Sequence, residues 1–445
     1  AMAVYVFAPY HLLNQYQRGA MGEYFSFVWM PLLLLYAGDV LRSGRTGSQP
    51  VLPAMGPDSL MSFSGLAASF AGFLWTHPPA AYQFTLVFGV FIAVQAITRR
   101  EWRGLLRVAG GLIFGSMLAA AYFYPAIAEQ HLVHYDDVER TWPYHDSYVF
   151  DYGRKAHGRF FALFYERLDR IWIFNLAAIV LCAMLLMRYG ERQRPALRQT
   201  VRFGGLRSLT LPVPHRLWVV AGLLAGFLMT KFSAPLGRLI PKIEIGVFSW
   251  RMLAATSLCA ALLAGAVADR SNSFNRTTKG VTTMAILLAT LVMSGWYVVW
   301  PVWRGQAFEP NPAHYNYATL PRGAPRDVPP MDALQTASGQ GRVTIEHWTP
   351  EARALRVELD RDDQLQFRTF DFPGWTATID GQPAAIKHGA VRNIAVDVSA
   401  GSHRVTLEFR STPVRRASNW ISVLSIALLG AHAARVRLRD FPRKK

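Results

Sequence analysis

Two charged residues stand five positions apart just before a long apolar run. Arg18 and Glu23 precede the run that begins near Tyr24. Charged groups at membrane depth are costly and are usually functional or paired. Arg18 is a candidate for holding a phosphate through its guanidinium fork, and Glu23 is a candidate catalytic residue that orients an acceptor. On a helix this spacing points the two side chains in different directions, so they need not pair, and a set of interfacial anchors is the alternative.

Two further side chains are candidates for binding a substrate. His77 lies in THPPAA between two apolar runs, where the two prolines favour an extended turn that aims the imidazole into a cavity. Arg251 lies in FSWRML at the start of another apolar run and is a candidate for binding phosphate or pyrophosphate. The competing interpretations are a structural hydrogen-bond partner for His77 and a snorkelling anchor for Arg251.

A third group of candidates lies in one acidic connecting segment. The stretch HLVHYDDVERTWPYHDSYVFDYGRK places Asp136, Asp137 and His145 among aromatic residues. Adjacent carboxylates raise the pKa of one of them for base chemistry or hold a divalent metal ion, and aromatic rings beside acids suit carbohydrate. We take Asp136 and Asp137 as candidate catalytic residues and His145 as a candidate substrate ligand, assign no metal site and leave metal dependence open. A solvated acidic loop at the membrane interface is the alternative.

The composition excludes two broad classes of protein. Hydrophobic residues make up 51% of the 445 positions and the mean hydropathy is +0.15, which is too apolar for an ordinary soluble enzyme. The formal net charge is +18, but the basic residues form short blocks between apolar runs and not the single stripe that nucleic acid requires.

The sequence has no P-loop, Rossmann glycine pattern or serine elbow, which disfavours a nucleotide sugar as donor. Cys182 and Cys259 lie in apolar runs and are predicted to be buried thiols.

The apolar runs predict a polytopic α-helical membrane bundle. A bilayer core requires about 20 mostly apolar residues per helix. About nine candidate spans follow: 24–41, 61–76, 80–97, 105–124, 171–188, 217–233, 250–268, 281–301 and 418–434.

The connectors between these runs predict the orientation. Residues 188–216 hold seven Arg against one Glu, and the tail 435–445 holds six basic residues against one Asp. Residues 125–170 have the opposite bias, with eight acids and six bases. By the positive-inside rule the basic connectors are cytoplasmic, so 125–170 and 302–417 are extracytoplasmic. We therefore expect a multi-pass protein of the bacterial cytoplasmic (inner) membrane.

A stretch near the carboxyl terminus has a different character. Seven short runs with period-two alternation lie between residues 342 and 409, separated by turn residues, and predict an antiparallel β-sandwich. Asp380-Gly381 is a favoured two-residue hairpin turn, because both positions favour positive φ. Trp375 follows a Pro373-Gly374 bend and is a candidate sugar-stacking platform. A buried core position is the alternative for Trp375, and general burial statistics favour it.

These patterns divide the chain into five parts. They are a helical bundle (1–301), a Pro-rich connector (302–340), an extracytoplasmic β-sandwich (341–412), a last transmembrane helix (418–434) and a basic cytoplasmic tail (435–445). The predicted fold is thus a bundle of about nine spans with a small sandwich inserted before the last span.

The carboxy-terminal stretch resembles a known module. FPGWTATIDGQPAAIKHGAVRNIAVDVSAGSHRVTLEFRSTP, followed by an apolar run, is similar to the sandwich of YfhO-type bacterial membrane proteins, which join it to a bundle of the GT-C glycosyltransferase kind. YQRGAMGEYFSFVWMPLLLL, WTHPPAA and IEIGVFSWRMLAATSL are similar to segments of those bundles and of 6-pyruvoyl-tetrahydropterin synthase-related membrane domains. Together these stretches are spread over most of the chain.

The resemblance implies transfer of a sugar from a polyprenyl-phosphate-linked donor to a cell-envelope acceptor on the extracytoplasmic face. It implies no certain cofactor. Its partners would be membrane lipids, the lipid-linked sugar and a saccharide or envelope polymer, with no nucleic acid. GT-C enzymes usually carry a catalytic acid in the first outer loop, and this sequence opens mid-pattern with AMAVYVFAPYHLL. We therefore expect a fragment that lacks upstream spans, and the acid can lie in the missing part. Two alternatives stay open, a transporter or flippase of lipid-linked saccharides and a non-catalytic envelope scaffold with a binding sandwich.

Overall fold

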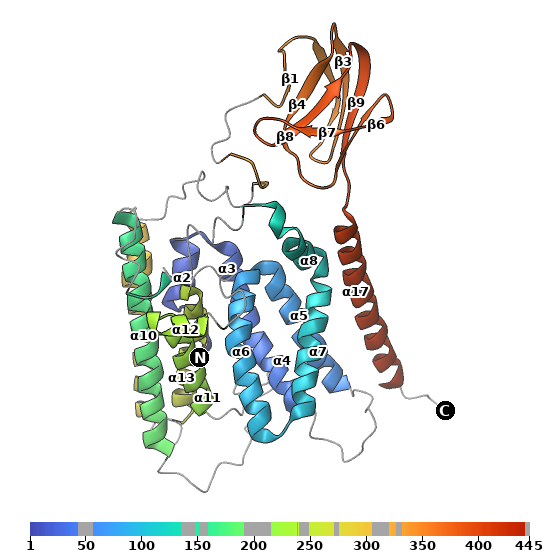
Figure 1. The fold of residues 1–445 in the computed structure, drawn as a ribbon. Coiled ribbons are helices and arrows are strands. Elements are labelled where there is room, and N and C mark those ends of the chain that lie inside the picture. Colours follow the sequence, from blue (N-terminus) through green and yellow to red (C-terminus); the bar gives the residue numbers. More distant parts are fainter. Residues whose placement is uncertain are drawn as a thin grey trace. The chain divides into compact units, whose positions relative to one another are not determined.

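The computed structural model describes residues 1–42, 57–134, 147–150, 159–190, 215–237, 239, 249–270, 276–304, 320–325 and 332–440. This part of the chain is mostly helical and ends in two antiparallel sheets followed by a long helix (Figure 1). Contacts between residues divide the chain into a first unit (1–119, 141–309 and 424–445) and a second unit (120–140 and 310–423).

The first unit is built from helices. They are α1 (Met2–Val6), α2 (Pro9–Tyr16), α3 (Met21–Ser26), α4 (Trp29–Arg42), α5 (Pro57–Thr76), α6 (Pro78–Arg99), α7 (Trp102–Leu118), α10 (Arg159–Gly190), α11 (His215–Phe227), α12 (Ala234–Gly237), α13 (Met252–Arg270), α14 (Arg276–Ser294) and α15 (Trp300–Trp303). Short 3-10 helices cover Lys231–Ser233 and Ser249–Arg251, and a π-helical turn covers Gly295–Val299. The helix α17 (Pro413–Asp440) belongs to both units, because the division falls after residue 423.

Five helices among the described residues are long and apolar enough to cross a membrane. They cover Met21–Leu41, Pro78–Thr98, Phe164–Met187, Ser249–Asp269 and Thr283–Trp303. The broken pair α7 and α8 adds a sixth if it is counted as one span, and Leu60–Thr76 and His215–Phe227 are shorter apolar helices. Each of the nine predicted runs overlaps a helix. The run 418–434 lies in α17, which is not one of these five helices.

Two of these helices carry apolar side chains on exposed faces. On α10, Ile173, Leu181 and Met187 expose at least half of their surface, and on α14, Met284 and Leu288 do the same. Exposed apolar faces of this extent are uncommon in soluble monomers and mark contact with lipid or with another protein. The helical unit is therefore compatible with a multi-pass membrane protein.

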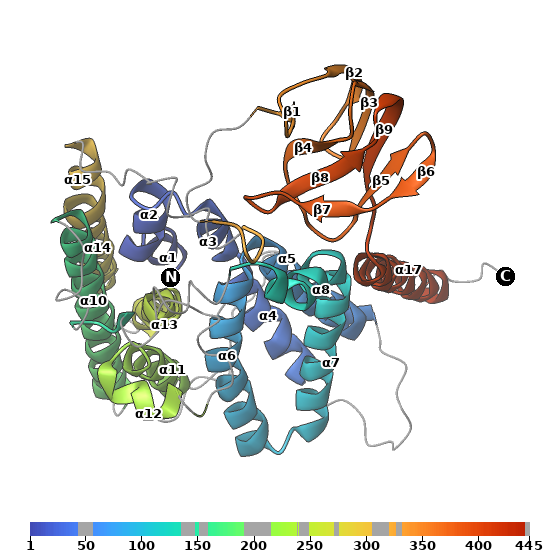
Figure 2. The same ribbon diagram turned by 45° about the horizontal axis from the view of Figure 1, so that its top comes forward.

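The helices of the first unit pack in two groups that one helix joins. Helices α4, α5 and α7 pack together, as do α10, α11 and α13, while α6 contacts members of both groups (Figures 1 and 2). Glycines allow close approach within each group. A Cβ at Gly115 of α7 would lie 2.6 Å from the carbonyl oxygen of Ala67, and one at Gly226 of α11 would lie 2.7 Å from the Leu176 side chain. The short helices α2 and α3 contact α13 and α6 respectively, so their connection lies where the two groups meet.

The second unit contains two antiparallel sheets. Its described strands are β1 (Leu334–Thr336), β2 (Arg342–Trp348), β3 (Ala352–Leu359), β4 (Asp363–Phe370), β5 (Trp375–Ile379), β6 (Gln382–Ala384), β7 (Ile386–His388), β8 (Asn393–Val398) and β9 (Gly401–Phe409). The sheet orders are β1-β4-β8-β7 and β2-β3-β9-β5-β6, as Figure 2 shows. Their inward side chains share one core, which includes Leu355, Val357 and Leu407 from one sheet and Phe367 and Val396 from the other. This confirms the predicted two-sheet antiparallel region.

The strand predictions were right in kind and incomplete in detail. The run predicted as one strand over residues 384–388 is two strands, because β6 pairs with β5 in one sheet and β7 pairs with β8 in the other. The chain therefore crosses between sheets at residue 385. The strand β1 lies within the stretch predicted to be a connector. Asp380 and Gly381 form the predicted hairpin turn with φ of +51° and +79°.

The FPGW bend is explained by contacts within the second unit. Gly374 has φ of +122°, and a Cβ there would lie 2.5 Å from the carbonyl oxygen of Arg410, so glycine is required. The guanidinium of Arg415, at the start of α17, lies over the rings of Phe372 and Phe409. Arg415 also donates through Nε and Nη2 to Glu129 at 3.1 and 2.7 Å. Glu129 follows α8 (Ala120–Ala128), so this ion pair joins three segments of the unit.

Candidate functional site

A turn between two short helices brings Arg18 onto Glu23. Helix α2 ends at Tyr16 and α3 begins at Met21, and Gly19 in the connection has φ of +60°. The prediction that the two side chains diverge assumed one continuous helix and is wrong. Because the turn reverses the chain, Arg18 Nη1 donates to Glu23 Oε2 at 2.8 Å.

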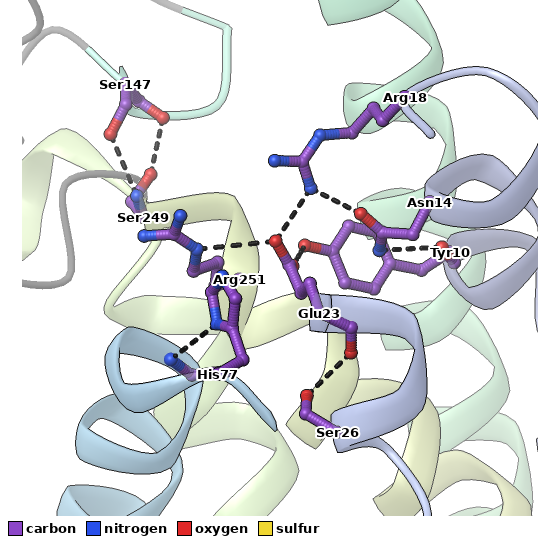
Figure 3. A network of polar contacts seen from close by, with 10 residues as sticks. Tyr10, Asn14, Arg18, Glu23, Ser26, His77, Ser147, Ser249 and Arg251 are labelled. Atoms are coloured by element: carbon purple, nitrogen blue, oxygen red, sulfur yellow. Dashed lines mark hydrogen bonds and ion pairs between the residues drawn. The ribbon is translucent and has the colours of Figure 1, made fainter. Parts of the chain in front are cut away.

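Glu23 is the centre of a buried network (Figure 3). Its side chain is 1% exposed, and Oε2 also accepts from Arg251 Nε at 3.4 Å. The other oxygen, Oε1, accepts a hydrogen bond from the hydroxyl of the fully buried Tyr10. Arg18 Nη1 also donates to Asn14, whose amide donates to the Tyr10 carbonyl at 3.1 Å. Arg18 and Arg251, which lie far apart in the sequence, thus share one carboxylate.

The position of Arg251 is set by the segment that leads into α13. Residues Ser249–Arg251 form a 3-10 turn, and α13 begins at the next residue. The backbone N–H of Ser249 donates to Ser147 Oγ at 2.9 Å, and the Ser249 hydroxyl donates to the Ser147 carbonyl. Both serines are buried and the Arg251 side chain is 9% exposed. The guanidinium therefore enters the network from the start of α13 and does not extend into solvent.

His77 lies beside this network, and its backbone is extended, with φ of −161° and ψ of 87°, as the following proline favours. The predicted extended turn is limited to this residue, because Pro78 and Pro79 already begin helix α6. His77 caps this helix, and its Nδ1 accepts from the backbone N–H of Ala80 at 3.1 Å. A nitrogen that accepts in this way carries no proton, which leaves Nε2 as the donor of a neutral ring. Figure 3 shows the imidazole next to Arg251.

Close packing holds α3 against the His77 connection. A Cβ at Gly22, next to Glu23, would lie 2.9 Å from the carbonyl oxygen of Thr76. A side chain at this position would therefore push α3 and its carboxylate away from α6. The predicted candidates Arg18, Glu23, His77 and Arg251 meet in one place because of these contacts.

The charges of the cluster define what it can bind. Two guanidinium groups and one carboxylate give this trio a net positive charge, in a site where few atoms contact water. Buried ion pairs contribute little net stability, since desolvation of the charges offsets their attraction. Guanidinium groups are suited to bidentate recognition of phosphate and carboxylate. The arrangement is therefore suited to an anionic ligand.

The remaining predicted residues are not part of this cluster. Asp136, Asp137 and His145 lie outside the described residues. Trp375 packs partly buried against the core of the two sheets, with the Phe409 ring 5.2 Å away and the guanidinium of Arg353 over its own ring at 4.8 Å. Its role in sugar stacking stays a prediction.

Tyr10 and Asn14 were missed from the sequence. They stand four residues apart and Arg18 follows four residues later, and a polar row at this spacing marks one face of a helix. That signal was available, and only their partner Glu23 could not be identified from it.

In the described part of the chain no group of three or more His, Cys, Asp or Glu could hold a metal ion. Cys182 and Cys259 are free and buried, as predicted.

A second polar row, in the two-sheet unit, has the order serine, histidine, aspartate. Ser399 Oγ lies 3.2 Å from His403 Nε2, and His403 Nδ1 lies 2.7 Å from Asp380 Oδ2. The same Nε2 lies 3.3 Å from the Ala400 carbonyl oxygen, so both ring nitrogens face acceptors, an arrangement that favours the protonated ring. A ring in that form cannot take a proton from serine. We interpret this row as a contact between two turns and not as a catalytic triad.

The His403–Asp380 contact gives a pH prediction. Hydrogen bonding to Asp380 raises the pKa of His403, and bonds from the Arg404 backbone and His403 lower the pKa of Asp380. The contact therefore stabilises the fold fully below the ordinary histidine pKa of about 6.5, and this is lost as pH rises through the raised value. On the acid side it is lost as pH falls through the lowered pKa of Asp380.

An NMR titration of the histidine signals tests this contact. Asp380→Asn should move the titration of His403 to lower pH. The signals of His388, which pairs with Asp371, are the control and should not respond. Equal titration of His403 in both proteins would show that the contact does not form in solution.

Comparison with known proteins adds no relative to this description. No family model matches the chain, and no curated protein or solved structure matches it either.

Proposed function

We propose that the chain is an integral-membrane glycosyltransferase of the GT-C kind, and that the cluster of Arg18, Glu23 and Arg251 binds the phosphate of a polyprenyl-phosphate-linked sugar. The observation that carries the proposal is the meeting of two guanidinium groups at one buried carboxylate, beside the neutral ring of His77. Ionisable groups in such helical units usually mark substrate pathways.

The donor chemistry follows from the charges. One guanidinium balances the charge of one carboxylate, so the second gives the trio a positive charge that an anionic head group neutralises. A lipid-linked phosphate brings both that anion and an apolar chain. The exposed apolar faces of the helices suit the chain, and the guanidinium forks suit the phosphate.

We assign Glu23 a positioning role toward the two arginines, in place of the predicted catalytic role in which it orients an acceptor. Both of its oxygens already accept hydrogen bonds, Oε1 from Tyr10 and Oε2 from the two arginines. To act as a general base it would have to release these partners first. Its function in the proposal is to hold the two guanidinium groups in one orientation.

The charge pattern of the connectors supports the orientation of the proposed enzyme. The basic connectors would be cytoplasmic, which puts the two-sheet unit and the connection at His77 on the extracytoplasmic side. The reaction would then take place on the outer face of a bacterial inner membrane, with an envelope saccharide as acceptor. Resemblance to YfhO-type proteins supports the same assignment.

A flippase of lipid-linked saccharides is the second candidate. The observation that favours it is that both Glu23 oxygens already accept hydrogen bonds, since binding and movement of a head group require no base. The phosphate site would be the same in both cases.

Reconstitution with a labelled donor separates these functions. The full chain would be placed in proteoliposomes with a panel of polyprenyl-phosphate sugars labelled in the sugar and with a panel of saccharide acceptors. Movement of the label from the lipid to an acceptor hydroxyl, with release of free polyprenyl phosphate, is expected for the transferase, and it should be abolished in Arg251→Ala. Movement of intact donor between leaflets would indicate the flippase. Neither process, with protein that is folded, would contradict both.

A further inference from the structure

One charged side chain lies in the core-facing row of the five-stranded sheet. Along β3 the buried positions alternate, and Arg353 occupies the same row as Leu355 and Val357. It is 8% exposed. Trp348 on the edge strand β2 is its direct cross-strand neighbour, and Trp375 lies on the same face two strands away. The arginine thus closes one end of the core between two tryptophans.

The two indole rings hold the Arg353 guanidinium without hydrogen bonds. Its central carbon lies 4.6 Å from the centre of the Trp348 ring and 4.8 Å from that of Trp375. Nε and Nη1 are buried and have no hydrogen-bond partner among the described residues. Burial lowers the pKa of Arg353, with no acidic side chain acting in the other direction. Cation–π contacts offset part of the desolvation of such a charge, but they satisfy none of its N–H groups.

The third nitrogen gives this group a connection to the surface. Nη2 is not among the buried unpaired atoms, so it is the nitrogen in contact with solvent. Nη1 and Nη2 share the end-on edge of the guanidinium, and this edge binds a carboxylate with two parallel hydrogen bonds. Trp348 is 37% exposed on an edge strand, so it is the more accessible of the two rings.

We propose that Arg353, with Trp348 and Trp375 on either side, binds a saccharide that carries a carboxylate group. The guanidinium would pair with the carboxylate, and an indole ring would contact the apolar face of the sugar. The ligand would satisfy the buried N–H groups that the protein leaves unpaired. In this site the Trp375 ring lies against the guanidinium and is not an open platform. The proposal concerns binding alone and holds whether or not the chain transfers sugars.

Calorimetric titration of the full chain in detergent tests the site. The probes are trigalacturonic acid, the neutral trisaccharide maltotriose and inorganic phosphate. We expect trigalacturonic acid to bind at least tenfold more tightly than either of the other two. Arg353→Gln should weaken its binding at least tenfold, as loss of a charge-assisted pair requires. Arg404→Gln is the control, since Arg404 is exposed on the same sheet and pairs with Glu346, and it should leave the affinity unchanged.

A second variant keeps the test independent of folding. Trp348→Leu retains the arginine and changes an edge strand only. It should weaken the binding of trigalacturonic acid several-fold and leave the thermal unfolding temperature of the two-sheet unit unchanged. Equal affinity of wild-type protein for the acidic and neutral trisaccharides would overturn the proposal. Phosphate binding as tight as that of the trisaccharide, or equal affinities of the Arg353 and Arg404 variants, would overturn it as well.

Discussion

Glu23→Gln is expected to destabilise the helical unit by about 3–5 kcal/mol, because removal of one partner from a buried ion pair leaves the other charge uncompensated. Glutamine has nearly the same size, so the change tests charge and not packing. It leaves Arg18 and Arg251 facing each other across a neutral amide. The free energy of unfolding in mixed micelles measures the effect. Glu166→Gln is the matched control, since Glu166 and its partner Arg170 are about half exposed and such pairs contribute about 0–1 kcal/mol.

A double variant separates charge balance from general damage. Glu23→Gln combined with Arg251→Met removes one charge of each sign from the cluster. It should be less destabilised than the sum of the two single variants, with a coupling of about 1–3 kcal/mol. Strict additivity of the two changes would show that Glu23 and Arg251 do not interact in the folded protein, and the proposed cluster would be wrong.

Arg251→Ala should raise the dissociation constant for polyprenyl phosphate by about 10–150-fold, which corresponds to the loss of a hydrogen bond to a charged group of about 1.5–3 kcal/mol. Arg251→Lys keeps the charge and loses the planar fork, so its binding should be intermediate. Native mass spectrometry of the protein in nanodiscs measures these constants.

Arg170→Ala is the control for the binding measurement. This residue is also an arginine on an apolar helix, but it pairs with Glu166 at the surface and lies outside the cluster. Its affinity for polyprenyl phosphate should equal that of the wild type. If both alanine variants bind equally well, the lipid phosphate is not held by Arg251.

The elements could be predicted from the sequence because their signals are local. Apolar runs marked the positions of the helices, and period-two alternation with Asp380-Gly381 marked the strands and their tight hairpin. Errors arose where the structure depends on which strand a segment pairs with. The run 384–388 has one alternating pattern, and only its pairing with two different sheets divides it into β6 and β7.

The residues of the site could be predicted from the sequence, but their arrangement could not. Arg18, Glu23, His77 and Arg251 were each chosen for chemistry at the end of an apolar run. The contact between Arg18 and Glu23 depends on the turn at Gly19. The contact between Arg251 and Glu23 depends on packing between helices that are far apart in the sequence. His77 shows the same limit, since two prolines are compatible with an extended turn and with a helix start, and the bond to Ala80 decides between them.

Arg353 had one signal in the sequence, because it precedes Leu355 and Val357 at a spacing of two and so interrupts the apolar row of β3. What the row could not show is that two tryptophan rings lie against the guanidinium. Residues that are exceptions to a local pattern are therefore where the folded structure adds most to a sequence analysis.

The most direct test is a cryo-electron microscopy structure of the full chain in nanodiscs with polyprenyl phosphate added. We predict density for the phosphate within about 3 Å of guanidinium nitrogens of both Arg18 and Arg251, with Glu23 still between them and the lipid chain along the helices. Phosphate density at another place, or an unchanged cluster with the lipid bound only along the outer helix faces, would contradict the account.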